Sequence, residues 1–199
     1  MSAGNDSIGS AVHAMSSKFI SEFVDQYPMK PAKEKWTFFA SRYASDLTET
    51  VCACINLYFR QVTQVWYTEK YKNHHPRLFL EYPLRTSRFT GKGNGRADAM
   101  ILTPSKVWLF DLKTGENPAS FQQLKIYALA VIRDFGLSDN TDFELTIVQP
   151  NRLLSDQQVR SERWTAKGLK EAQWRYQDYP ALLEFLNGSV KERLYMRGD

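Results

Sequence analysis

The fold is decided by a stretch that runs from Asn94 to Tyr127 and reads NGRADAMILTPSKVWLFDLKTGENPASFQQLKIY. It predicts two short strands, at 96–102 and 107–113, followed by a turn and the start of a helix. Three of its residues are charged where a half-buried hairpin favours apolar or neutral groups: Asp98, Asp111 and Lys113. These three charges need a functional explanation.

The turn between the two strands determines how they pair. Pro104 has a fixed negative φ, which rules out a two-residue primed turn that starts with it. A four-residue loop from Thr103 to Lys106, built on a type I turn with the proline second, fits the sequence. Leu102 then pairs with Val107, and counting outward places the two aspartates opposite each other. A three-residue loop would instead shift the pairing by one residue.

Two carboxylates that face each other across neighbouring strands lie about 5 Å apart and repel. A hard divalent cation with oxygen ligands would offset the repulsion. Lys113 follows Asp111 by two residues and so projects from the same face of the strand. A cation and an ammonium beside a phosphate supply the charge stabilisation and water positioning of phosphoryl transfer. Taken singly, each residue has a simpler explanation, as a solvated strand aspartate or a chance D-x-K match.

The helix after the hairpin is expected to start at Asn117-Pro118, an N-cap and N1 pair, and to end before Gly136. Gln123 and Tyr127 lie four residues apart and share one stripe of this helix. Judged alone, they would be an ordinary surface glutamine and a core aromatic residue. Beside the charged hairpin, they are candidates for the same site.

The other segments predict an α/β domain with a small mixed sheet flanked by helices. Helices are expected at 10–25, 32–44 and 45–70, strands at 78–84 and 143–149, and a helical tail from 165. No linker divides the chain, so residues 1–199 are expected to form one domain. Its parts would be a core at about 78–150, a helical N-terminal part at 10–72 and a helical C-terminal part at 160–190.

Positive charge is concentrated in one segment. The net charge of the chain is +4, yet residues 70–96 hold seven basic residues and one acidic residue, a local charge of +6. A basic segment on a slightly acidic body indicates a polyanionic partner such as nucleic acid, although a solvated charge run is the simpler alternative. The basic residues are Lys70, Lys72, Arg77, Arg85, Arg88, Lys92 and Arg96.

The two cysteines, Cys52 and Cys54, cannot form a disulfide framework and are too few for an all-thiolate iron–sulfur cluster. They fit best as small apolar residues on a helix, and a zinc site with His74 and His75 would have an unusual ligand spacing. The N-terminus lacks the features of a secretory signal, and no apolar stretch approaches membrane-spanning length. The expectation is a cytoplasmic protein with no membrane partner.

Several motifs together resemble one nuclease family. They are Gly95-x-x-Asp98, then Asp111-Leu112-Lys113-Thr114-Gly115, then Gln123-Leu124-x-x-Tyr127-Ala128, with Gly9-x-x-x-His13 near the N-terminus. In this order they resemble the RecB-like branch of the PD-(D/E)XK nuclease superfamily, and within it the free-standing phage-type members. Glu81 and Val148-Gln149-Pro150 also fit this subgroup. Two features of some relatives are missing: a glutamate one turn after the histidine, and the iron–sulfur cysteines.

The resemblance implies a restriction-endonuclease-like core and a role for each matched residue. Asp98, Asp111 and the Leu112 carbonyl would bind Mg²⁺ or Mn²⁺, with His13 completing the ligand set. Lys113 would orient the attacking water and contact the scissile phosphate. Gln123 and Tyr127 would position the lysine or the DNA backbone, and Glu81 would be an additional acid. No iron–sulfur cluster is expected.

The expected function is a metal-dependent deoxyribonuclease, an exonuclease for DNA end processing in recombination or repair. The alternatives are a structure-selective or nicking endonuclease and, from another class, a non-cleaving DNA-binding or assembly subunit on a nuclease fold. Arg85, Arg88, Lys92 and Arg96 would hold DNA phosphates without reading sequence. The aromatic C-terminal segment, with Trp164 and Trp174, suggests a homo-oligomer unless it packs under the sheet, and a recombination protein is a further expected partner.

Overall fold

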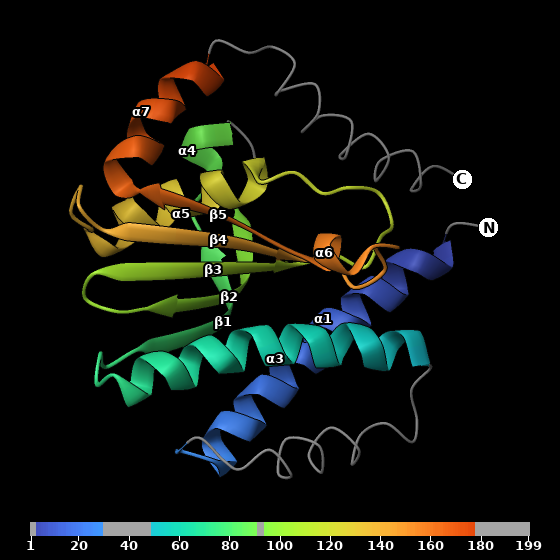
Figure 1. Cartoon of the computed structure of the whole chain (residues 1–199). Coiled ribbons are helices and arrows are strands. Elements are labelled where there is room, and N and C mark those ends of the chain that lie inside the picture. The colour runs from blue at the N-terminus through green and yellow to red at the C-terminus, as the bar shows by residue number, and fades with distance from the viewer. Residues whose placement is uncertain (1–2, 30–48, 91–93, 178–199) are drawn as a thin grey trace.

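A five-stranded mixed sheet with helices on both faces forms the body of the protein, in the order β1-β2-β3-β4-β5 (Figure 1). The computed structural model describes residues 3–29, 49–90 and 94–177. Its strands are β1 (Arg77–Leu84), β2 (Gly95–Leu102), β3 (Lys106–Leu112), β4 (Asp142–Val148) and β5 (Val159–Thr165). Its helices are α1 (Ala3–Gln26), α3 (Glu49–Tyr71), α4 (Ser87–Thr90), α5 (Gln122–Phe135), α6 (Ser155–Gln158) and α7 (Ala166–Gln177).

The strand pairing confirms the predicted hairpin and crossover. β1, β2 and β3 are joined antiparallel, β3 and β4 are parallel, and β5 is antiparallel to β4. Leu102 pairs with Val107, so the loop between them has the predicted four residues. The Thr103 hydroxyl closes this loop by accepting a hydrogen bond from the backbone N–H of Lys106, 3.1 Å away. The parallel β3–β4 pair requires the connection through α5.

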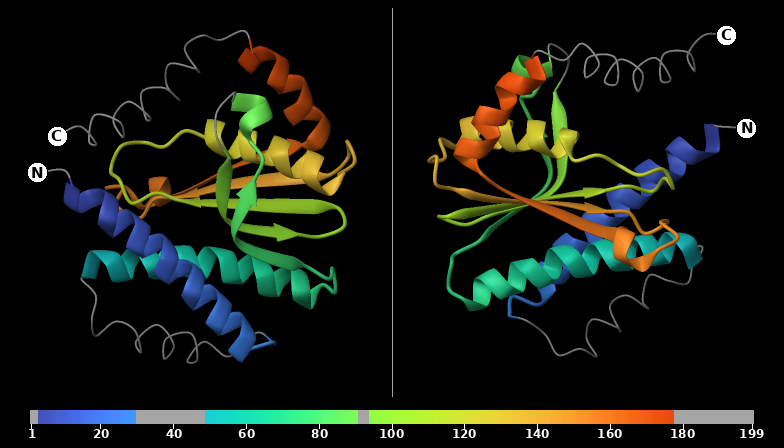
Figure 2. Two further views of the ribbon diagram at one scale, coloured as in Figure 1. Left: turned by 180° about the vertical axis from the view of Figure 1, so that it is seen from behind. Right: turned by 45° about the horizontal axis from the view of Figure 1, so that its top comes forward.

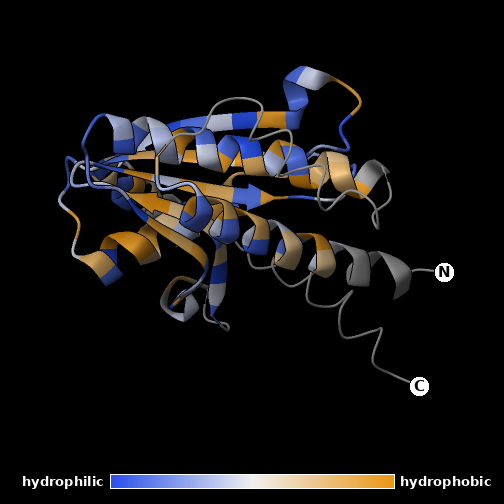
Figure 3. Ribbon diagram, turned by 90° about the horizontal axis from the view of Figure 1, so that it is seen from below, coloured by the Kyte–Doolittle hydropathy of each residue, from blue (hydrophilic) through white to orange (hydrophobic). Residues whose placement is uncertain are grey.

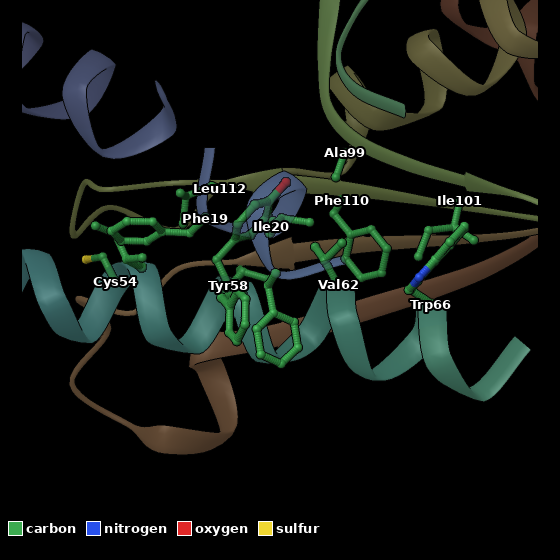
Figure 4. Packing of buried hydrophobic residues seen from close by; sticks show 14 of the residues in the cluster. Phe19, Ile20, Cys54, Tyr58, Val62, Trp66, Ala99, Ile101, Phe110 and Leu112 are labelled. Carbon is green, nitrogen blue, oxygen red and sulfur yellow. The ribbon is translucent and has the colours of Figure 1, made fainter. Parts of the chain in front are cut away.

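Two apolar cores lie on opposite faces of the sheet. α1 and α3 cross each other on one face, and α5 covers the other (Figure 2). The first core includes Phe23, Tyr58 and Phe110, and Figure 4 shows its side chains between α3 and the strands. The second core includes Leu109 and Leu145 and is closed by α5 and α7. Hydrophobic and hydrophilic residues alternate along the helices (Figure 3), as expected where one side is buried.

Two predicted elements differ from the structure. α5 begins at Gln122, with Phe121 at its N-cap, and not at Asn117-Pro118. Residues 159–165 form the fifth strand, where the sequence predicted the start of a helical part. The helix expected at 32–44 lies outside the described residues, as do 45–48 and Lys92. The expected end of α5 is confirmed, since Gly136 has φ 60° and its N–H bonds the carbonyls of Arg133 and Ile132.

Within the described residues, none of the helices is both long and apolar enough to span a membrane.

Candidate functional site

Asp98 and Asp111 lie where β2 and β3 stop pairing. The last paired residues are Ala99 and Phe110, so each aspartate lies one residue beyond the paired part of the hairpin, and the Asp98 carboxylate is close enough to raise the pKa of Asp111. The Leu112 backbone N–H donates to the Asp98 carboxylate, 2.8 Å from Oδ2. A side-chain acceptor thus replaces a strand partner at this position. The hairpin therefore ends in two acids held at the same edge of the sheet.

Asp111 is buried, with 4% of its surface exposed. The pKa of its carboxyl is raised to about 6, because burial and the nearby Asp98 carboxylate raise it more than Lys113 and His13 lower it. The Lys113 ammonium lies 3.0 Å from Asp111 Oδ1, which confirms that the two side chains project from the same face of the strand. The site keeps a carboxylate in an environment that disfavours its ionised form, as functional sites often do.

A chain of hydrogen bonds runs from Lys113 to α5. The lysine Nζ donates to Gln123 Oε1 at 2.9 Å, and Gln123 Nε2 donates to the Tyr127 hydroxyl at 2.6 Å. The Arg96 backbone N–H also donates to this hydroxyl, and burial raises the tyrosine pKa. The predicted spacing of Gln123 and Tyr127 is therefore used to orient the lysine.

Gly95 allows Tyr127 to lie against β2. A Cβ atom added at Gly95 would lie 2.5 Å from Tyr127 Cε1 and 3.1 Å from Thr86 Cγ2. Non-bonded carbon atoms do not approach this closely, so any larger residue would displace the ring. The glycine in the Gly95-x-x-Asp98 motif thus has a packing reason.

A cluster of possible metal ligands is formed by His13, Glu81 and Asp98. One ligand atom from each lies within 4.8 Å of the other two. His13 Nδ1 is 3.2 Å from Asp98 Oδ1. Burial lowers the pKa of His13, but Asp98 and the other nearby carboxylates outweigh this effect, so its pKa is raised overall. Helix α1 thus contacts the hairpin through His13, the residue whose match to the nuclease motifs was the least specific.

Glu81 reaches the cluster from a distorted strand. Its φ is +52°, in the left-handed region that few non-glycine residues adopt, and the β1–β2 pairing skips it between Leu80 and Tyr82. Its carboxylate accepts from the Ser17 hydroxyl at 2.9 Å and pairs with Arg96 Nε at 2.8 Å. Strained residues of this kind cluster at functional sites.

The cluster suits a hard divalent cation. Carboxylates are ligands that both Mg²⁺ and Mn²⁺ accept. The imidazole suits Mn²⁺ better than Mg²⁺. Asp111 is not in the three-residue cluster and pairs with Lys113, yet it is close enough for its charge to raise the pKa of His13. The Leu112 carbonyl stays a predicted ligand.

Side-chain hydrogen bonds hold the backbone of the loop after Lys113. The residues that donate them were not predicted from the sequence to have this role. The side chain of Gln149, 1% exposed, donates to the carbonyls of Gly115 and Asn117 and accepts from the Ala119 N–H. Asn151 donates to the Thr114 carbonyl at 2.6 Å. Arg152 and Arg160 donate to the carbonyls of residues 116 and 119. The Val148-Gln149-Pro150 motif pointed to Gln149, but the sequence did not show which groups its side chain would bond.

The predicted DNA-binding residues have varied surroundings. Arg96 pairs with Glu81, so it contacts the cluster itself. Arg85 is exposed, and its carbonyl accepts from Arg133 at 2.7 Å. The Arg88 side chain and Lys92 lie outside the described part of the chain.

The structure gives the zinc alternative no support. Cys54 lies near the start of α3 and its thiol bonds Asn151, whereas His74 follows the end of this helix and bonds Glu69. Twenty residues of helix separate two groups by about 30 Å. The cysteines and histidines therefore cannot share one ion.

The family comparison matches nearly the whole chain. A family model described as "Protein of unknown function (DUF2800)" covers residues 2–178, so the chain belongs to this family. The search of curated proteins finds no match. A solved structure titled "Crystal structure of SSO0001" is 13% identical, covers 83% of this chain and 88% of that chain, and has a TM-score of 0.27. A TM-score this low does not establish a shared fold.

Proposed function

We propose that this member of the DUF2800 family is a deoxyribonuclease that requires Mg²⁺ or Mn²⁺ and hydrolyses phosphodiester bonds. One observation carries the proposal: His13, Glu81 and Asp98 converge beside Asp111, which is bonded to Lys113. Residues from α1, β1, β2 and β3 meet at one edge of the sheet. The motif resemblance to RecB-like nucleases supports the same assignment.

Each side chain has a distinct task in this proposal. His13, Glu81 and Asp98 would hold the cation, with Asp111 nearby. A divalent cation, when bound, polarises the phosphate and lowers the pKa of a water molecule. Lys113, held by Asp111 and Gln123, keeps an ammonium where the negative charge on the phosphate grows. Tyr127 fixes Gln123 and thus the direction of the lysine side chain.

The substrate is DNA, and the motif resemblance favours an exonuclease that processes DNA ends in recombination or repair. Arg85 and Arg96 would contact phosphates next to the site. The buried Asp111 argues against the non-cleaving alternative, because a protein that no longer cut DNA would gain stability from an uncharged residue there. A partner from recombination and a homo-oligomer remain parts of the proposal.

The test compares end-labelled linear DNA with closed circular DNA in Mg²⁺ or Mn²⁺. Wild type is expected to degrade the linear DNA, and Asp111→Ala and Lys113→Ala to lose at least a hundredfold in rate, as loss of a charge-stabilising group does. Lys125→Ala is the matched control, because Lys125 is a lysine on α5 that pairs with Glu162, 2.8 Å away. If wild type cleaves neither DNA with either metal ion, the proposed nuclease activity is refuted. Cleavage of the circle replaces the exonuclease by an endonuclease.

A further inference from the structure

Two buried hydroxyl groups lie on the helices that face the sheet. Tyr58 is 1% exposed and Ser16 is fully buried. Among the described atoms of the protein, neither hydroxyl oxygen has a hydrogen-bond partner. A buried hydroxyl without a partner costs about 1–3 kcal/mol, and a phenylalanine would fill the tyrosine position without this cost. Both groups therefore need an explanation.

Tyr58 extends from α3 toward the site. Figure 4 shows its hydroxyl oxygen pointing at the sheet, toward the strands that carry Ala99 and Leu112. These two residues directly follow Asp98 and Asp111 in sequence. Burial raises the tyrosine pKa well above its usual value, and the carboxylates of Asp98, Asp111 and Glu81 raise it further. The phenol is therefore neutral, and its O–H is a donor close to three acids.

Ser16 approaches the same region from α1. It lies three residues after His13, which contacts Asp98. The next residue, Ser17, donates to Glu81 at 2.9 Å. His13, Ser16 and Ser17 thus lie on one turn of α1, and the Ser16 hydroxyl is unpaired among the described residues.

We propose that Tyr58 is a positioning residue for the cation site, whose hydroxyl, together with that of Ser16, binds a buried water that donates a hydrogen bond to the Asp98 carboxylate. Such a water accepts two hydrogen bonds and donates one, which is typical of buried water. Asp98 already accepts from the Leu112 N–H and contacts His13, and a carboxylate can accept about four bonds. The water would keep the carboxylate oriented toward the cation.

This inference rests on the proposed cation site. Residues that orient metal ligands typically contribute 10- to 100-fold to metal affinity. If the two hydroxyls only pack between helices, removing them would leave metal affinity unchanged. The two explanations therefore differ in a binding measurement that does not depend on catalysis.

The experiment measures Mn²⁺ binding by titration calorimetry and thermal unfolding in a chelator. Tyr58→Phe is expected to bind Mn²⁺ about tenfold or more weakly than wild type, and its unfolding in the chelator checks that the variant is folded. Tyr67→Phe is the matched control on the same helix, because its hydroxyl donates to the Tyr27 carbonyl. This control is expected to melt lower and bind Mn²⁺ as wild type does.

Ser16→Ala gives an independent test and is expected to weaken Mn²⁺ binding in the same direction. If both variants are combined, the loss should be smaller than the product of the two single losses, because both hydroxyls bind one water. Equal Mn²⁺ affinity of wild type and Tyr58→Phe overturns the inference and leaves the proposed function intact. Absence of Mn²⁺ binding by wild type overturns both.

Discussion

Replacing Asp111 by asparagine should stabilise the metal-free protein at neutral pH while abolishing cleavage. The pKa of this carboxyl is raised from 3.8 to about 6, because burial raises it more than the bond to Lys113 lowers it. A raised pKa means that the ionised carboxylate is less stable in the folded protein than in the unfolded chain. The difference corresponds to about 3 kcal/mol of unfolding free energy at pH 7.5.

The sign with pH follows from the proton balance. Between the unfolded pKa and the folded pKa, the folded protein binds more protons, so lowering the pH through about 6 relieves the cost. At pH 5 the advantage of the Asp111→Asn variant should fall to about half of its value at pH 7.5. Asparagine has nearly the same volume and still offers an oxygen to Lys113, so packing should change little.

The assay is urea unfolding in a chelator at pH 7.5 and pH 5. Asp142→Asn serves as the control, because Asp142 is an exposed aspartate at the start of β4, and surface changes of this kind stay within about 0.5 kcal/mol. Added Mn²⁺ should stabilise wild type more than Asp111→Asn. A variant that is less stable than wild type at pH 7.5, or a difference that is the same at both pH values, would refute the reasoning.

Three further outcomes are expected. Gly95→Ala should lose about 1–3 kcal/mol on urea unfolding and much of its cleavage rate, because the added methyl overlaps the Tyr127 ring; Gly115→Ala, with nothing within 4 Å, is its control, and equal behaviour of the two contradicts the packing argument. Gln149→Leu should lose at least about 2 kcal/mol on urea unfolding, since three hydrogen bonds between the buried Gln149 amide and the loop are lost; wild-type stability would contradict this. Mn²⁺ affinity by calorimetry should rise with pH as His13, whose pKa is raised, gives up its proton; His13→Ala should flatten this profile, and an unchanged slope would exclude the histidine as a ligand.

Local sequence signals predicted the centre of the fold because they act over a few residues. Pro104 determined the loop length, and the loop length determined the strand register. The αL conformation of Gly136 needed only the preference of glycine for positive φ. The pairing of Gln123 with Tyr127 followed from helix periodicity.

Long-range contacts explain the predictions that were wrong. Asn117-Pro118 has the composition of a helix start, but the Asn117 carbonyl accepts a hydrogen bond from the buried Gln149 amide instead of a helical N–H. The helix therefore begins only at Gln122. β5 was missed because VRSERWT is polar and lies at the sheet edge, where a strand shows weak apolar alternation. Neither partner can be identified from the neighbouring sequence.

The structure explains why Glu81, and not Asp111, joins His13 and Asp98. Leu80 packs into the core under α1 and α3, whereas Tyr82 packs into the core under α5. A regular strand would point both side chains to one face, so the left-handed backbone of Glu81 reverses the alternation. The reversal occurs at the position opposite Asp98, which lies between the paired residues Ala97 and Ala99.

Two unfavourable features therefore meet at one place: a left-handed glutamate, which costs about 1–3 kcal/mol, and a buried carboxylate with a raised pKa. Regular pairing of β1 and an asparagine at position 111 would remove both costs, yet the chain keeps them. A bound cation would compensate both at once, by favouring the ionised carboxylates and by using the Glu81 geometry. Divalent cations should accordingly raise the stability of wild type more at pH 7.5 than at pH 5, where protons already relieve Asp111 and occupy His13.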